Sequence, residues 1–131
     1  MPEKVTYALL IYRTTEGEPT PERAERALVG HRALQAEAAR EGDLRAVAKL
    51  DSARLAKTVR GELGSHDITD GPYIEAKEWL VGFYLLDCAS EDEALRRAQQ
   101  ICPVEDHAIE VRPVEWRWST EQVESGPTSR V

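Results

Sequence analysis

Two short apolar runs constrain the fold of this chain more than any other feature of it. They are residues 5–12 (VTYALLIY) and residues 79–86 (WLVGFYLL). Both are rich in β-branched, aromatic and aliphatic side chains and are too short for independent helices, which indicates β-strands. Each run is apolar on both faces, which is typical of a central strand whose sheet is covered on both sides. The sheet that contains these two strands must therefore be covered on both of its faces.

Two helices are predicted from capping signals. Thr20, followed by Pro21 and an acidic turn, marks the start of a long helix that Gly42 would end. Ser90, followed by three acidic residues, marks the start of a second helix that ends before Pro103. Apolar residues recur at helical spacing in both segments. These two helices are enough to cover only one face of a sheet.

Shorter extended segments are predicted at residues 44–50, 57–60, 66–69 and 107–114, the last at a sheet edge because of Pro113. In the first of them, alternation puts four apolar residues on one side and Arg45, Val47 and Lys49 on the other. The order of elements predicts an α+β, ferredoxin-like βαββαβ antiparallel sheet with two helices on one face. We expect a second copy of the chain to cover the other face, forming a homodimer of the dimeric α/β barrel type.

Composition limits the class of function. The chain has 131 residues, enough for one domain, which we place at residues 1–118 with a flexible tail at 119–131. The net charge of -7 argues against binding to nucleic acid or an anionic membrane surface. No apolar stretch approaches the roughly 20 residues that span a bilayer, and no signal-peptide pattern follows Met1, so we expect a cytoplasmic protein.

The run Asp70-Gly71-Pro72-Tyr73 is the most informative motif. Glycine and proline favour a rigid turn, and an aspartate can bond its backbone. If the chain is extended after the turn, Tyr73, Glu75 and Lys77 point to one side. The motif is then either a ligand-binding loop or a turn required only for folding, since these residues are ordinary turn formers.

The motif resembles the D-G-P-F sequence of the YCII-related proteins, with Tyr73 in place of Phe, and the resemblance extends to the E-V-R-P-V run at residues 110–114. It implies a dimeric ferredoxin-like fold, related to muconolactone isomerases and antibiotic-biosynthesis monooxygenases. The function of the family is mostly unassigned. Members with this motif are often encoded beside extracytoplasmic-function sigma factors, which implies a sigma factor or another protein as a possible partner.

His31 is the first catalytic candidate. Its spacing from Leu28 and Leu34 places it near the apolar stripe of the first helix, where a histidine is most often a packed core residue. The resemblance implies instead a catalytic dyad of this histidine with an aspartate near the end of the second helix. No aspartate stands at Cys102-Pro103. Asp70 is the second catalytic candidate, as a replacement for the missing acid, and Asp106 is a weaker alternative.

Tyr73, Glu75, Lys77 and Arg112 complete the candidate site as ligand-binding residues. We predict no metal or other cofactor, because His66 and His107 lack metal-ligand spacing and there is no glycine-rich phosphate loop. The predicted function is binding of a small polar ligand, with His31 as general base in isomerase or lyase-like chemistry. The alternative is a non-catalytic regulatory module that binds a ligand or a protein. Whether the protein is an enzyme stays open at this point.

Overall fold

The computed structural model describes residues 3–14, 19–72, 78–102 and 105–119. The elements in chain order are β1 (Val5–Arg13), α1 (Pro21–Arg40), β2 (Leu44–Lys49), the 3₁₀ turn η1 (Ala53–Leu55), β3 (Lys57–Glu62), β4 (Ser65–Asp70), β5 (Trp79–Cys88), α2 (Glu91–Gln100) and β6 (His107–Pro113). Residues 120–131 lie outside the described residues, so the flexible tail stays a prediction.

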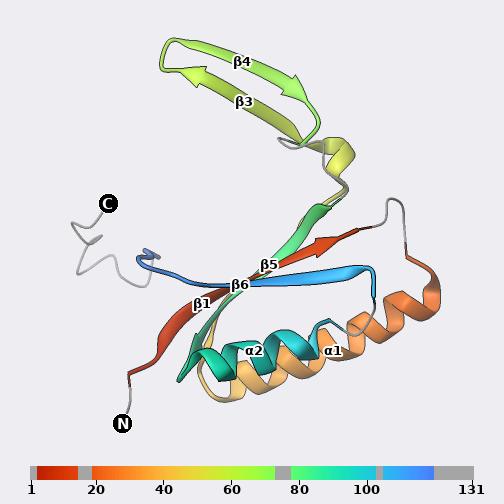
Figure 1. Cartoon of the computed structure of the whole chain (residues 1–131), viewed down its shortest axis with the longest axis vertical. Helices are drawn as coiled ribbons and strands as arrows, with labels where there is room; N and C mark the ends of the chain where they lie inside the picture. The colour runs from red at the N-terminus through yellow and green to blue at the C-terminus, as the bar shows by residue number, and fades with distance from the viewer. Residues whose placement is uncertain (1–2, 15–18, 73–77, 103–104, 120–131) are drawn as a thin grey trace.

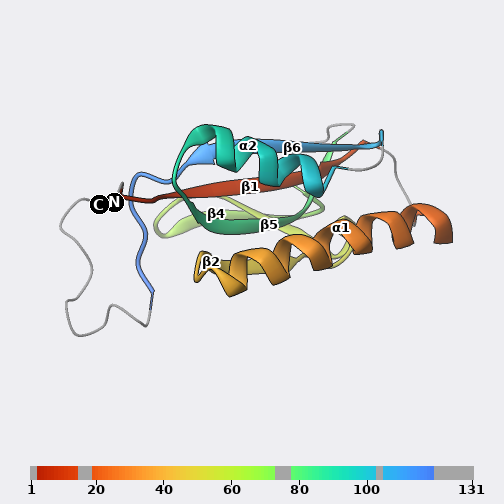
Figure 2. The same cartoon turned by 90° about the horizontal axis from the view of Figure 1, so that it is seen from below.

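Four strands form one antiparallel sheet in the order β2-β5-β1-β6. Both helices pack on the same face of it (Figures 1 and 2). This is the βαββαβ arrangement of the ferredoxin-like fold, and the predicted fold class is confirmed. The two apolar runs are the central strands β1 and β5, and β6 is an edge strand, as Pro113 indicated.

The core lies between the sheet and the helix layer. It is formed by side chains that alternate along the central strands and by one stripe of each helix: Leu9, Ile11, Tyr84, Leu86, Cys88, Leu34, Ala38, Ala94, Ala98 and Ile101. Burial of a large aliphatic or aromatic side chain contributes about 1.5–3 kcal/mol. The core is therefore the main source of stability. Its residues on α1, Leu34 and Ala38, lie on the same helix as His31.

The two helix starts agree with the capping prediction. Thr20 Oγ1 accepts a hydrogen bond from the Arg23 amide at 3.3 Å, and Ser90 Oγ accepts one from the Glu93 amide at 3.1 Å. The Glu93 carboxylate in turn accepts the amide of Ala89, the residue before the cap, at 3.0 Å, which further ties the chain to the start of α2. Neither described helix is long and apolar enough to cross a membrane.

Strand β2 departs from its predicted alternation. The register with β5 shifts between Leu44 and Ala46, which is a β-bulge. Leu44 packs on the core, and after the bulge it is Val47 and Lys49 that pair with Tyr84 and Gly82 on the helix-covered face. The predicted separation of Leu44 from Val47 and Lys49 is therefore wrong, because one extra residue inverts the faces.

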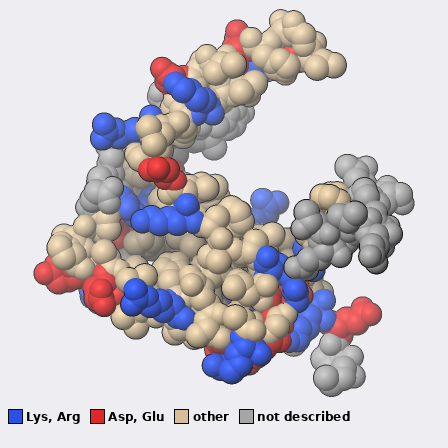
Figure 3. Space-filling view, turned by 180° about the vertical axis from the view of Figure 1, so that it is seen from behind, with Lys and Arg blue, Asp and Glu red and all other residues tan. Residues whose placement is uncertain are grey.

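Strands β3 and β4 form a separate two-stranded hairpin that stands away from the main sheet, on the side opposite the helices (Figure 1). The space-filling view shows it projecting from the rest of the protein (Figure 3). Its side chains are almost entirely exposed, including Val59, Leu63 and Ile68. At its base, Gly71 adopts a φ of +96°, which favours glycine, and its amide donates to Ala56 O at 2.8 Å. The motif Asp70-Gly71 thus closes the hairpin onto the body of the protein.

The second face of the sheet is apolar at its centre. Leu10 pairs with Phe83 and Ala8 with Leu85, with Ala46 also opposite Leu85. These side chains are half-buried, and no described helix covers this face, since both helices lie on the other side of the sheet in Figure 1. We call this surface, made by Ala8, Leu10, Ala46, Phe83 and Leu85, the open face.

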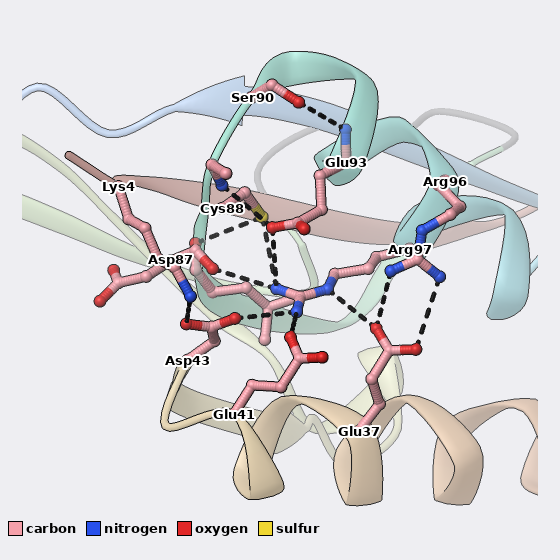
Figure 4. A network of polar contacts seen from close by, with 12 residues as sticks. Lys4, Glu37, Glu41, Asp43, Asp87, Cys88, Ser90, Glu93, Arg96 and Arg97 are labelled. Atoms are coloured by element: carbon pink, nitrogen blue, oxygen red, sulfur yellow. Dashed lines mark hydrogen bonds and ion pairs between the residues drawn. The ribbon is translucent and has the colours of Figure 1, made fainter. Parts of the chain in front are cut away.

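A buried arginine joins the two helices to the loop before β2 (Figure 4). Arg97 on α2 is fully buried, and its guanidinium contacts Glu37 at 3.1 Å, Glu41 at 2.9 Å and Asp43 at 2.8 Å. Burial alone would lower the pKa of Arg97, but its hydrogen bonds to Asp43 and Glu37 raise it, so the charge is kept. The network fixes the C-terminal end of α1 against α2 and the sheet.

Candidate functional site

A cavity of about 290 Å³ lies between α1 and the sheet. Its walls come from α1, from β2 and β5, and from the ends of β1 and β6. Ile11, Ala27, Leu28 and Val47 give it an apolar surface, and no Asp or Glu is among the described residues that line it. A concave, mostly apolar space with a few polar groups is the usual form of a small-molecule site.

His31 lies on the wall of this cavity, half-buried on α1. Its Nδ1 is 2.8 Å from the hydroxyl of Tyr84 on β5, and Gln35 Nε2 donates to the same hydroxyl at 3.0 Å. Gln35 follows His31 by one helical turn, so both side chains reach Tyr84 from one side of α1. The His31 and Tyr84 rings are also stacked, with centroids 5.7 Å apart and an interplanar angle of 3°.

These hydrogen bonds bear on which ring nitrogen of His31 carries the proton. Because Gln35 donates to the Tyr84 oxygen, the Tyr84 proton is available for His31 Nδ1, and a neutral imidazole then carries its proton on Nε2. Burial lowers the pKa of His31, as do the charges of His107 and Lys49, so the ring is neutral at pH 7. No described residue bonds Nε2. In this tautomer His31 can donate an N–H from Nε2 to a ligand, and its role as a general base stays a prediction.

His107, at the start of β6, is a second histidine on the cavity wall. Its Nδ1 is 3.2 Å from Asp106 Oδ1, while the other carboxylate oxygen of Asp106 is 3.1 Å from Arg23. Burial lowers the pKa of His107, and the Asp106 carboxylate opposes that shift. A carboxylate beside Nδ1 favours the tautomer with a free Nε2 lone pair. The ion pairs that the structure shows for Asp106 are with Arg23 and His107, and Asp106 as a partner of His31 stays a prediction.

Asp70 lies elsewhere, at the end of β4. Its exposed carboxylate pairs with Lys57 on the neighbouring strand, and Asp70 does not line the cavity. Thr58 Oγ1 holds the loop by donating to Gly71 O at 2.7 Å. Within one chain the structure therefore does not bring Asp70 to His31, and the catalytic role of Asp70 stays a prediction.

Of the four predicted ligand-binding residues, the structure describes only Arg112. Arg112 is exposed on β6 opposite Ala8, which places it on the open face of the sheet, away from the helices. The other three, Tyr73, Glu75 and Lys77, lie outside the described residues. Among the described residues, no group of His, Cys, Asp or Glu is arranged to hold a metal ion.

Sequence reasoning missed four residues of the cavity: Gln35, Lys49, Tyr84 and His107. Gln35 could have been found, because it lies one helical turn after His31. Lys49 could not, because the bulge in β2 leaves no signal in the alternation. His107 was set aside because no metal-ligand spacing involves it, although Asp106 precedes it directly.

The sheet, the helix layer and the cavity beneath α1 together define an α+β protein of ferredoxin-like fold with a small-molecule-sized site. A sequence model of the YCII-related domain matches residues 5–119, and the chain belongs to this family. An uncharacterized protein of Rhizobium meliloti (strain 1021) is 38% identical over 112 residues, covering 82% of this chain and 90% of the relative. Membership of the D-G-P-F subgroup stays a prediction.

Proposed function

We propose that the cavity binds a small polar ligand and that His31 takes part in acid/base chemistry on it, of an isomerase or lyase-like kind. The observation that carries this proposal is the 2.8 Å contact of His31 with Tyr84 at the wall of a cavity of about 290 Å³. An imidazole held in one orientation beside an apolar space is suited to directed proton transfer.

The two histidines would have complementary roles. A neutral His31 with its proton on Nε2 can donate to a ligand carbonyl oxygen and stabilise the negative charge that develops there. His107, with Asp106 beside Nδ1 at 3.2 Å, has the free lone pair needed to accept a proton from the carbon next to that carbonyl. The ligand would lose a proton to His107 as an enolate forms, and regain one at another position.

Proton exchange provides a test that does not require the natural substrate. A panel of small 2-oxo and 3-oxo acids in D₂O would be followed by ¹H NMR for deuterium uptake beside the carbonyl. We expect the wild-type protein to accelerate uptake for at least one compound, and His31→Gln and His107→Gln to slow it about 100-fold or more. His66→Gln is the matched control, because His66 is exposed on the hairpin and does not line the cavity. Equal rates in all three variants would exclude the mechanism.

We also propose that the protein is a homodimer that uses the open face. Leu10, Phe83 and Leu85 are half-buried in one chain, and a second sheet packed on them would complete an α/β barrel. Leu10→Glu would bury a charge in this interface and should convert a dimer to a monomer in sedimentation. Leu95→Glu, at a 41% exposed position on α2, should leave the dimer unchanged. A monomeric wild-type protein at micromolar concentration would refute the assembly.

A catalytic role for Asp70 depends on this dimer, because in one chain Asp70 is paired with Lys57 outside the cavity. If the motif loop of a second copy reaches the cavity, Asp70→Asn and His31→Gln would each be inactive, and mixed dimers would regain activity at one site. Tyr73, Glu75 and Lys77 follow Asp70 closely in the sequence and would act with it, whereas Arg112 would lie in the interface. No recovery on mixing would leave Asp70 as a residue of the hairpin base.

A non-catalytic protein-binding module is the second candidate function, and the exposed hairpin is the observation that favours it. Val59 and Ile68 face each other across β3 and β4 and are 61% and 69% exposed. Such a pair could contact a protein such as a sigma factor. Pull-down from the native host should then recover a stoichiometric partner that is lost in a Val59→Lys, Ile68→Lys variant. Loss of the partner in this variant, together with no proton exchange by the wild-type protein, would favour the protein-binding module over the enzyme.

A further inference from the structure

The cavity differs in charge from the protein as a whole. The chain carries a net charge of -7, yet the described residues that line the cavity include Arg13, Arg23 and Lys49 and no carboxylate. Arg23 is already paired with Glu105 at 3.4 Å and Asp106 at 3.1 Å. Lys49 has no ion-pair partner within the part of the chain that the structure describes. Arg13 also has an interaction within the protein. Of these three cations, Lys49 is therefore the one best able to meet a ligand.

The bulge in β2 is what brings Lys49 to this face. After the bulge Lys49 pairs with Gly82 of β5, which lies on the same face of the sheet as Tyr84. The absence of a side chain at Gly82 lets the backbone of β2 approach β5 closely at Lys49, because a Cβ there would lie 2.7 Å from the Ala48 carbonyl oxygen. The positive charge of Lys49 also contributes to lowering the pKa of His31, which agrees with their common position at the cavity.

The remaining walls suit the body of an organic molecule. Ala27, Leu28 and Val47 are apolar, and the stem of Lys49 can lie along such a surface while its ammonium group stays polar. The His31 N–H is a second donor. A single lysine with one N–H donor and an apolar wall matches one carboxylate on a small apolar body better than it matches a neutral or cationic molecule.

We propose that the cavity selects a small organic acid in its anionic form, with Lys49 as the counter-charge to its carboxylate and His31 Nε2 as a hydrogen-bond donor to the ligand. This inference rests on the proposed ligand-binding function of the cavity and adds its chemical class. It also implies that Lys49 sets specificity and does not itself transfer a proton.

A matched set of ring compounds tests the charge preference at constant size. Benzoate, benzamide and benzylamine would be titrated into the full-length protein at pH 7.5 and low salt, with binding followed by calorimetry and by NMR shifts of the His31 ring. We expect benzoate to bind at least tenfold more tightly than benzamide, and benzylamine to bind most weakly.

The variants separate a specific role of Lys49 from a general effect of charge. Lys49→Gln should abolish the tenfold preference, and Lys49→Arg should retain most of it. Lys57→Gln makes the same charge change on the hairpin, outside the cavity, and should leave the preference intact. Circular dichroism would confirm that each variant is folded.

Two results would overturn the proposal in distinguishable ways. Equal affinity for benzoate and benzamide would refute the anion preference while keeping the cavity as a ligand site. No binding of any of the three compounds would refute both the anion preference and the ligand-binding function. A preference that survives in Lys49→Gln would exclude Lys49 as its source.

Discussion

Tyr84 is the residue on which the geometry of the cavity depends. Its ring is buried in the core, while its hydroxyl contacts His31 Nδ1 at 2.8 Å and Gln35 Nε2 at 3.0 Å. One side chain thus contributes both to packing and to the orientation of the imidazole. Burial raises the pKa of Tyr84, so its hydroxyl keeps its proton and remains a donor at neutral pH.

Tyr84→Phe should therefore have two effects. Loss of the hydroxyl leaves two half-buried groups without their partner, and we expect the free energy of unfolding in urea to fall by about 1–3 kcal/mol. The pKa of His31, measured by NMR titration, should rise towards its ordinary value of about 6.5, because a bond that favours the neutral ring is lost. Tyr12→Phe is the control, since the Tyr12 hydroxyl makes only an exposed 3.4 Å contact with Glu110. Equal losses in both variants would contradict this role of Tyr84.

The contact between the two helices depends on two features, the Arg97 network and the absence of a side chain at Gly30. Arg97 makes its ion pairs while fully buried, so removal of the guanidinium takes a buried counter-charge from three carboxylates at once. Arg96 still pairs with Glu37 and Lys4 with Asp43. A Cβ at Gly30 of α1 would lie 2.2 Å from the carbonyl oxygen of Gln100 in α2. The helices can approach this closely only because position 30 is glycine.

Arg97→Met should reduce the free energy of unfolding by about 3–5 kcal/mol, because it breaks a buried ion-pair network from one side. Its neighbour Arg96 offers a matched control, since it pairs with the same Glu37 at 2.8 Å but is 52% exposed. Arg96→Met should cost less than about 1 kcal/mol in the same urea titration. Similar losses in the two variants would show that burial of Arg97 adds nothing.

Gly30→Ala should destabilise the protein, although helix propensity alone predicts a gain of about 0.5–1 kcal/mol. The added methyl group must push α1 away from the backbone of α2, and such overpacking costs about 1–3 kcal/mol. The sign of the change in the urea midpoint decides between the two effects. A more stable variant would mean that the helices separate easily.

At the scale of the whole molecule, titratable groups at the cavity and at the helix contact both make the folded protein less stable as the pH falls. Burial lowers the pKa of His31 and of His107, so the unfolded chain binds more protons than the folded one below about pH 6.5. The hydrogen bonds of Glu37 to Arg96 and Arg97 lower its pKa, and although burial of Asp43 opposes the effect, Lys4 and Arg97 lower its pKa too. Stability is therefore lost on acidification.

Urea unfolding from pH 7.5 to pH 3 should show two steps in the free energy of unfolding. The first begins below about pH 6.5 with a slope of up to about 1.4 kcal/mol per pH unit for each histidine, as His31 and His107 must take up protons. The second begins below about pH 4.5, as Glu37 and Asp43 lose their charge. Replacing both histidines with Gln should remove the first step and keep the second. A flat profile between pH 7 and pH 5 would contradict the burial of these rings.

Much of the architecture could be predicted because its signals are local. The capping residues Thr20 and Ser90 mark both helix starts, and the two-faced apolar runs mark the central strands. The candidate site was predicted less well, because it depends on contacts between distant segments. The sequence indicates that His31 lies near the core, but it carries no sign of the contact with Tyr84, which is 53 residues away in the sequence.

By itself, the sequence determined the class of fold, the two helices, the central strands and the position of His31 on α1, because periodicity and capping are properties of neighbouring residues. Only the tertiary structure decided that the motif Asp70-Gly71 closes a hairpin and that His107 and Lys49 face the same cavity as His31. The reason is physical: a one-residue bulge in β2 and the pairing of four strands select which side chains share a face, and neither leaves a local pattern.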